Sequence, residues 1–211
     1  MSRTALALLA GTGVIALVDW AAVLASNRRL EYAAKPAVMI GLIAVALALR
    51  PTSPAERALF IVALVLGLAS DVFLMLPKDM FLAGLVAALV EHIAYIAGFR
   101  ARELNVELLV IAVVVALASV AAFMPPIYRA LRNSRPKLVA PVIVYVAVFV
   151  VMVASAGGTG SLVALCGALL FFYSDAILAW NRFVRPVPFG RIVNLVPYHV
   201  GEALLVVSLV R

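Results

Sequence analysis

The sequence contains little cysteine and little charge. Cys166 is the only cysteine in 211 residues, so neither an intrachain disulfide nor a cysteine metal cluster can form. Asp, Glu, Lys and Arg together make up only 13% of the chain, whereas hydrophobic residues make up 66%. The mean hydropathy of +1.17 lies far above that of soluble globular domains. This composition excludes a soluble globular domain and a disulfide scaffold.

The short motifs of several common enzyme classes are also missing. The chain has no GxSxG elbow of a serine hydrolase, no P-loop and no Rossmann glycine pattern. It has no HExxH or other close spacing of metal ligands, so a metal site built from the two histidines and several acids is the weaker alternative. We expect neither a metal nor a cofactor. Because no polar linker is long enough to hold a soluble domain, function is expected to reside in the apolar segments.

Long apolar runs are the dominant feature of the sequence. Eight of them approach or exceed the roughly 20 residues that an α-helix needs to cross the hydrocarbon core of a bilayer. The alternation expected of a membrane β-barrel is absent, so we predict an all-α integral membrane protein that forms a single transmembrane domain over residues 1–211. The eight predicted transmembrane helices are residues 4–26, 34–50, 56–76, 80–99, 104–124, 137–155, 159–180 and 190–210.

The basic residues are divided unevenly between the two sides of these spans. Eleven of the 17 Lys and Arg lie beside the connections that follow the first, third, fifth and seventh spans. By the positive-inside rule this side is cytoplasmic and both termini lie outside. The net charge of +7 does not indicate nucleic acid, because the basic residues flank spans and face lipid headgroups instead of forming one patch. We therefore expect a multi-pass protein of a cell membrane, such as a bacterial inner membrane.

A short sequence pair recurs at about half the length of the chain. Ser70-Asp71-x-x-Leu74 returns as Ser174-Asp175-x-x-Leu178, an offset of 104 residues. The offset indicates two four-helix repeats, residues 1–104 and 105–211, in the same orientation, because four spans return the chain to its starting side. A chance match is the alternative in a chain so rich in Ala, Leu and Val. In either case both aspartates are predicted to lie about 9 Å inside the cytoplasmic ends of their helices.

Both histidines and five of the ten acids lie well inside the predicted spans, the acids being Asp19, Asp71, Glu91, Asp175 and Glu202. A charged group in the bilayer centre costs roughly 3 kcal/mol or more unless it faces the bundle interior, finds a partner or is protonated. Asp19 is near enough to the basic side to pair with Arg28 or Lys35, and hydrogen bonding between helices is the purely structural alternative for the other groups. Helical spacing gathers the polar groups on one side of the fourth and of the last span, at Glu91, His92, Tyr95, Tyr198, His199 and Glu202.

Three stretches taken together resemble a known family. They are SDVFLMLPKDMFLAGLVAALVEHIAYI at 70–96, YSDAILAWNRFV at 173–184 and YHVGE at 198–202. As an ordered set they resemble the YhhN/TMEM86 family of eight-span membrane proteins, and the resemblance covers nearly the whole chain. Ser70, the Tyr198-His199 pair and Glu202 depart from the residues usual in that family, but the two aspartates are intact.

The resemblance implies a lysoplasmalogenase-like ether hydrolase. Such an enzyme hydrolyses the vinyl ether bond of lysoplasmalogen, a lysophospholipid with an ethanolamine or choline headgroup, to a fatty aldehyde and glycerophospho-ethanolamine or -choline. Protonation of the vinyl β-carbon gives an oxocarbenium ion to which water adds, so the site needs an acid and a base. Two buried carboxyl groups can supply both. We therefore predict Asp71 and Asp175 as the catalytic pair, without assigning which of them is the acid.

The remaining parts of the substrate indicate further site residues. Lys35 and Arg182 are predicted to bind the phosphate through charge-assisted hydrogen bonds. Other polar side chains are predicted to orient the glycerol, the water or the carboxylates: His92, Tyr95, Asn181, Tyr198 and Glu202.

Two alternative functions remain open at this point. A proton-coupled or lipid transporter also uses buried acids and parallel repeats. An intramembrane aspartyl protease also sets two aspartates from two spans against each other. Its Y-D and G-x-G-D motifs do not match here, because Asp71 follows Leu-Ala-Ser and Asp175 follows Phe-Tyr-Ser.

Overall fold

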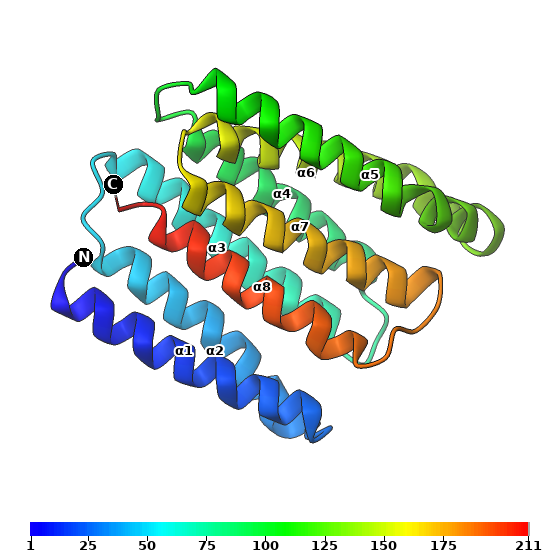
Figure 1. Cartoon of the computed structure of the whole chain (residues 1–211). Coiled ribbons are helices and arrows are strands. Elements are labelled where there is room, and N and C mark those ends of the chain that lie inside the picture. The colour runs from blue at the N-terminus through cyan, green and yellow to red at the C-terminus, as the bar shows by residue number, and fades with distance from the viewer. Residues whose placement is uncertain (211) are drawn as a thin grey trace.

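The computed structural model describes residues 1–210, which contain helices and no strand. The helices run up and down in one bundle with their axes nearly aligned (Figure 1). The prediction of an all-α membrane fold is confirmed. The helices are α1 (Arg3–Leu24), α2 (Arg28–Ala48), α3 (Pro54–Met75), α4 (Phe81–Phe99), α5 (Val106–Ser134), the short 3₁₀ helix η1 (Pro136–Leu138), α6 (Val139–Gly158), α7 (Leu162–Phe183) and α8 (Gly190–Val207).

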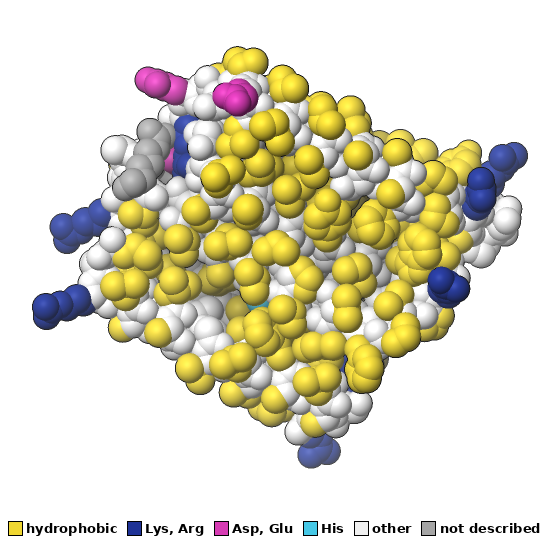
Figure 2. All heavy atoms as spheres, in the orientation of Figure 1, with side chains coloured by type: hydrophobic (Ala, Val, Ile, Leu, Met, Phe, Trp, Pro, Cys, Tyr) yellow, Lys and Arg dark blue, Asp and Glu magenta, His cyan; other side chains and the backbone are white. Residues whose placement is uncertain are grey.

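The connections alternate between the two ends of the bundle. We call the end with connections 25–27, 76–80, 135–138 and 184–189 the basic end. The opposite end, at the left of Figure 1, holds both chain termini and is called the terminal end. In Figure 2 the Lys and Arg side chains project at the two ends, and apolar side chains cover the surface between them. Helices α1 to α7 are long and apolar enough to cross a membrane, so the chain is a multi-pass membrane protein.

Helix α8 differs from the other seven long helices. It has 18 residues and carries Arg191, Asn194, His199 and Glu202, and it is not among the helices whose composition marks them as spans. It nevertheless packs along α7 and also contacts α1 and α2. His199 is 3% exposed and Glu202 is fully buried, so these polar side chains face other helices. That α8 is an eighth span remains a prediction, as does the division into two repeats.

Several helix ends differ from those predicted, and side-chain caps explain part of the difference. Asn27 accepts a hydrogen bond from the backbone N–H of Leu30, so α2 begins at Arg28 instead of residue 34 and Lys35 lies two turns inside the helix. Helix α7 continues to Phe183, which brings residues 181–182 into its last turn. Helix α5 passes through two prolines and ends at Ser134, ten residues beyond the predicted end at 124.

Two facing glycines set the spacing between α7 and α8. A Cβ added to Gly167 would lie 2.9 Å from the carbonyl oxygen of Gly201, and a Cβ added to Gly201 would lie 2.9 Å from the carbonyl oxygen of Gly167. Small residues allow such close backbone contact between membrane helices. The contact fixes the position of α7, which carries Asp175, relative to α8, which carries Tyr198.

Candidate active site

A cavity of about 430 Å³ lies within the bundle and reaches the basic end. Helices α2 to α8 all contribute to its lining. Glu91 and Phe149 line it near the middle of α4 and α6, and the exposed side chains of Arg28 and Arg191 line its mouth. A cavity of this size is typical of small-molecule sites in proteins.

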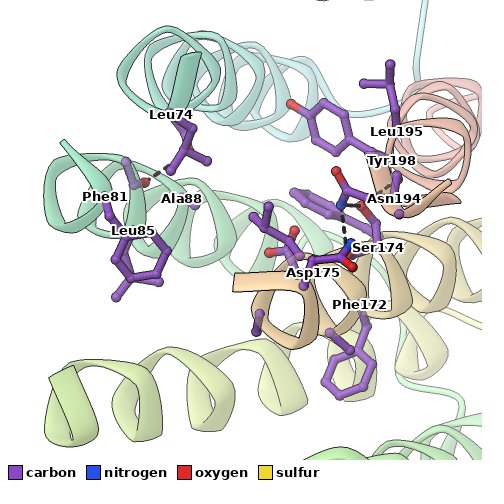
Figure 3. Close-up of a pocket in the computed structure, with 18 of the residues that line it drawn as sticks. Leu74, Phe81, Leu85, Ala88, Phe172, Ser174, Asp175, Asn194, Leu195 and Tyr198 are labelled. Atoms are coloured by element: carbon purple, nitrogen blue, oxygen red, sulfur yellow. Dashed lines mark hydrogen bonds between the residues drawn. The ribbon is translucent and has the colours of Figure 1, made fainter. Parts of the chain in front are cut away.

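The lining divides into two walls. The polar wall comes from α2, α3 and α8 and includes Arg28, Glu31, Lys35, Asp71, Arg191 and Tyr198. The apolar wall comes from α4, α5 and α6 and includes Leu85, Val120, Phe123, Met124, Ile127 and Val146. Helix α7 packs against both α5 and α8, so Asp175 stands where the walls meet. In Figure 3, Phe81 and Leu85 lie to one side of Asp175, and Asn194 and Tyr198 lie to the other.

Asp71 has a donor on each carboxyl oxygen. The Lys35 ammonium lies 2.7 Å from Oδ1, and the Tyr198 hydroxyl donates to Oδ2 at 2.9 Å. Asp71 is only 4% exposed, so this ion pair is largely removed from water. A cation on one oxygen and a phenol on the other stabilise the negatively charged carboxylate.

Asp175 has a different set of neighbours. The Tyr145 hydroxyl donates to its Oδ2, and the same phenol oxygen lies 2.9 Å from Nε2 of His92. No Lys or Arg of residues 1–210 forms an ion pair with Asp175, and no side chain in that range donates to its Oδ1. Asp175 is half-buried, so Oδ1 is left free on the cavity side. This environment does little to stabilise a negative charge.

Tyr145 was not predicted as a site residue. It is a single phenol in the apolar stretch VIVYVAVFV, with no polar neighbour at helical spacing to draw attention to it. Its position near the basic end of α6, at a depth similar to that of the aspartates, was the available signal. His92 was predicted to orient substrate or carboxylates, and it reaches Asp175 only through Tyr145.

Tyr95 and Glu202 do not reach the cavity, contrary to prediction. The Tyr95 hydroxyl donates to Oε2 of Glu202 at 2.5 Å, and both residues are fully buried behind the lining. Glu91, from the same polar stripe as Tyr95, is the acid that lines the cavity floor. The helical spacing of Glu91 and Tyr95 correctly identified the buried side of α4. Beyond Glu91, however, this side of α4 faces other helices instead of the cavity.

Asp19 does not form the expected pair with Arg28 or Lys35. Its Oδ2 lies 3.9 Å from Nε2 of His199, whose Nδ1 accepts a hydrogen bond from Nε1 of Trp20 at 3.1 Å. Asp19 is fully buried where α1 meets α8. The Lys35 ammonium contacts Asp71 instead.

The predicted phosphate ligands are occupied by carboxylates. Lys35 holds Asp71, and Arg182 donates to Oδ1 of Asp79 at 2.6 Å while its guanidinium lies 4.3 Å from the centre of the Phe81 ring. The bond from Arg182 lowers the pKa of the exposed Asp79 carboxyl in connection 76–80. Arg182 is not part of the cavity lining.

Asn181 lines the cavity and also shapes the loop beside it. Its Oδ1 accepts a hydrogen bond from the backbone N–H of Val187 at 2.8 Å. The amide thus ties the last turn of α7 to connection 184–189, which closes one side of the cavity mouth.

In both Ser-Asp pairs the serine hydroxyl donates a hydrogen bond to a backbone carbonyl of another helix. Ser70 Oγ donates to the backbone carbonyl of Gly84 on α4 at 3.0 Å, and Ser174 Oγ donates to the backbone carbonyl of Asn194 on α8 at 2.9 Å. The Asn194 amide returns hydrogen bonds to the carbonyl and hydroxyl oxygens of Ser174, as drawn in Figure 3. Each serine therefore joins its helix to the next one, and the aspartate beside it faces the cavity.

Fold and site together define a class of protein. The chain is a polytopic helical membrane protein with two unlike aspartates in one amphipathic cavity. Among residues 1–210 no three His, Cys, Asp or Glu side chains are close enough together to hold a metal ion. The arrangement suits acid–base chemistry on a molecule with one polar and one apolar end.

The chain belongs to the YhhN family, whose sequence model matches residues 30–209. It is 29% identical over 153 residues to human lysoplasmalogenase TMEM86B, covering 71% of this chain and 62% of that protein. It is 32% identical to the pig TMEM86B over 69% of this chain and 61% of that protein. Bovine lysoplasmalogenase TMEM86A is 28% identical, over 76% of this chain and 68% of that protein. No solved structure matches the chain.

These matches confirm the predicted family. The chain aligns with less than two thirds of the length of the TMEM86B relatives. All of α1, including Asp19 and Trp20, precedes the part that the family model matches.

Proposed function

We propose that this protein is a membrane-embedded hydrolase that cleaves the vinyl ether bond of lysoplasmalogen. The products are a fatty aldehyde and glycerophospho-ethanolamine or glycerophospho-choline. The observation that carries the proposal is that Asp71 and Asp175 line one cavity, Asp71 on its polar wall and Asp175 where the polar and apolar walls meet. Relatives named lysoplasmalogenases support the choice of reaction.

A single-chain ether lipid fits this arrangement of walls. Its hydrocarbon chain would lie along the apolar wall, where Val120, Phe123 and Ile127 of α5 face the cavity. Its headgroup would lie along the polar wall and point to the basic end. The vinyl ether joins these two parts of the lipid, so it would lie beside the aspartates.

The neighbours of the two aspartates suggest their roles. Asp175 has a free Oδ1 and no cationic partner, which suits the protonated acid that donates to the β-carbon of the vinyl ether. Asp71 is held as an anion by Lys35 and stabilises the oxocarbenium ion that this protonation creates. It then accepts a proton from the water that adds to the α-carbon.

The second half of the reaction returns both groups to their starting states. As the hemiacetal collapses, the bond from the α-carbon to the glycerol oxygen breaks, and that oxygen takes the proton held by Asp71. The hemiacetal hydroxyl gives its proton to Asp175 as the aldehyde forms. The cycle consumes one water and leaves no net proton, consistent with the logic of paired carboxyl groups in glycoside hydrolysis.

The two alternatives receive less support from the geometry. In an aspartyl protease two carboxyl groups share one proton, whereas here an ammonium lies 2.7 Å from one of them. A transporter accounts for the buried acids, but it does not require that two carboxyl groups with different partners line one cavity with a polar and an apolar wall.

The proposal is tested with purified protein in detergent. Lysoplasmenyl-ethanolamine should release fatty aldehyde, and the saturated alkyl ether analogue should not, because it has no β-carbon that can be protonated. Exhaustive chelation should leave the rate unchanged, since the chemistry is assigned to carboxyl groups. Absence of aldehyde from folded protein would refute the hydrolase and favour the transporter. Loss of activity on chelation would refute the acid–base mechanism.

A further inference from the structure

Three cationic side chains line the cavity, and they are not equivalent. Lys35 is paired with Asp71, and Arg191 donates to Oε1 of Glu31. Arg28 forms no ion pair with any acid of residues 1–210. The mouth therefore carries an uncompensated positive charge at Arg28.

Glu31 links the first turn of α2, which carries Arg28, to Arg191 of α8. Arg28 is the first residue of α2, and Glu31 lies three positions later, on the same face of the first turn. Arg191 is the second residue of α8 and crosses to α2 to reach Glu31. The mouth is thus flanked by two guanidinium groups and by the N-terminal ends of two long helices, all of which favour an anion.

Glu31 also offers an unused acceptor at this place. It is 6% exposed, and its Oε2 is buried with no hydrogen-bond donor from residues 1–210, although Oε1 is bound by Arg191. A buried carboxylate oxygen without a donor is costly, and it favours a ligand that brings a donor of positive charge. The mouth therefore presents two guanidinium groups, Arg28 of α2 and Arg191 of α8, beside one carboxylate oxygen from the first turn of α2.

We infer that the cavity mouth recognises a zwitterionic phosphodiester headgroup. Arg28 and Arg191 bind the phosphate, and Oε2 of Glu31 binds the ammonium of the amine. This inference rests on the proposed function, and it assigns headgroup recognition to residues other than Lys35 and Arg182. The Lys35 ammonium, one turn beyond Glu31 along α2, pairs with Asp71 instead.

The inference is tested with three vinyl ether lipids that share one chain. They are alkenyl-glycerophosphoethanolamine, alkenyl-glycerophosphate, which lacks the amine, and alkenyl-glycerol, which lacks the phosphate as well. Arg28→Gln should raise the apparent KM for both phosphate-containing lipids about tenfold, with little change in kcat and no change for alkenyl-glycerol. Arg29→Gln is the matched control, because Arg29 is exposed next to Arg28 but does not line the cavity.

Glu31→Gln separates recognition of the amine from support of Arg191. If Glu31 binds the ammonium, the variant should lose activity toward the ethanolamine lipid several-fold more than toward alkenyl-glycerophosphate. Equal losses on these two lipids would show that Glu31 only positions Arg191, and would overturn the ammonium site.

The remaining outcomes distinguish this inference from the proposed function. If the wild-type protein releases aldehyde but Arg28→Gln behaves like Arg29→Gln, the phosphate site is wrong and the hydrolase stands. An equal fall of Arg28→Gln on all three lipids would also overturn the site, because it would reflect a structural role. If the wild-type protein releases no aldehyde from any of the three, the proposed function itself fails.

Discussion

Asp71 and Asp175 have the same local sequence and line the same cavity, but their partners differ. Asp71 is clamped between the Lys35 ammonium and the Tyr198 hydroxyl. Among residues 1–210, the Tyr145 hydroxyl is the only side-chain donor to Asp175, which keeps one oxygen free on the cavity side. The pair therefore offers one stabilised anion and one carboxyl group that can carry a proton, which is the asymmetry that acid–base catalysis requires.

The partners that create this asymmetry are not repeated in the sequence. At the offset of 104 residues that relates the two Ser-Asp pairs, Lys35 corresponds to Val139 and Tyr145 corresponds to Gly41. If the chain arose by duplication, the aspartates and their serines were retained in both halves while the neighbouring helices diverged. Two copies of one motif can thus take different chemical roles because different helices cover them.

Of the variants that test the difference between Asp71 and Asp175, Asp175→Asn should have the largest effect on activity. Loss of the acid should lower kcat by about 10²- to 10⁴-fold. Thermal unfolding in detergent should be little changed, because the variant removes no ion pair. Aldehyde release and unfolding temperature are measured on the same preparation. A folded variant with wild-type kcat would remove Asp175 from the mechanism.

Asp71→Asn should lower both activity and stability. The rate should fall about 10²-fold with the loss of the base, and stability should fall by about 1–3 kcal/mol because Lys35 keeps a largely buried charge without its partner. The double variant Lys35→Met/Asp71→Asn should recover the unfolding temperature but not the activity. Recovery of both would mean that the ion pair is structural only.

Removal of the Tyr145 hydroxyl, which contacts Asp175, should lower kcat more than removal of the Tyr198 hydroxyl, which contacts Asp71. Tyr145→Phe removes the only side-chain donor that residues 1–210 offer to Asp175, together with the partner of His92, and should lower kcat about tenfold. Tyr198→Phe leaves Lys35 on Asp71 and should lower kcat only about threefold. Steady-state rates of both variants check the order. A larger fall in kcat for Tyr198→Phe than for Tyr145→Phe would contradict this expectation and show that the hydroxyl beside Asp71 matters more.

The smallest effects are expected at the two serines. Ser174→Ala should cost about 1–2 kcal/mol, because Ser174 Oγ both donates to the Asn194 carbonyl and accepts from its amide. Ser70→Ala, which removes one bond to the Gly84 carbonyl, should cost about 1 kcal/mol. Unfolding in detergent ranks the two variants. Equal losses of stability in the two variants would show that the Asn194 amide adds nothing to the hydrogen bond made by Ser174.

Much of the site was predictable because it depends on depth in the membrane. An acid inside an apolar span must face the bundle interior, so Asp71 and Asp175 could be chosen from the sequence. That Lys35 and Arg182 bind phosphate stays a prediction, because the sequence places them near the basic end but does not show that they pair with Asp71 and Asp79. Tyr145 was missed because a single tyrosine in an apolar helix has no periodic signal.

The sequence by itself determined that the chain is helical, that it lies in a membrane and that Asp19, Asp71, Glu91 and Glu202 are buried in the bundle. These properties are local: backbone groups in lipid must find partners within their own helix, and the hydrophobic length of each run sets a span. Only the tertiary structure decided how the two aspartates differ. Tyr198 lies 127 residues from Asp71 and Tyr145 lies 30 from Asp175, so these contacts depend on which helices pack together and on how each is rotated about its axis.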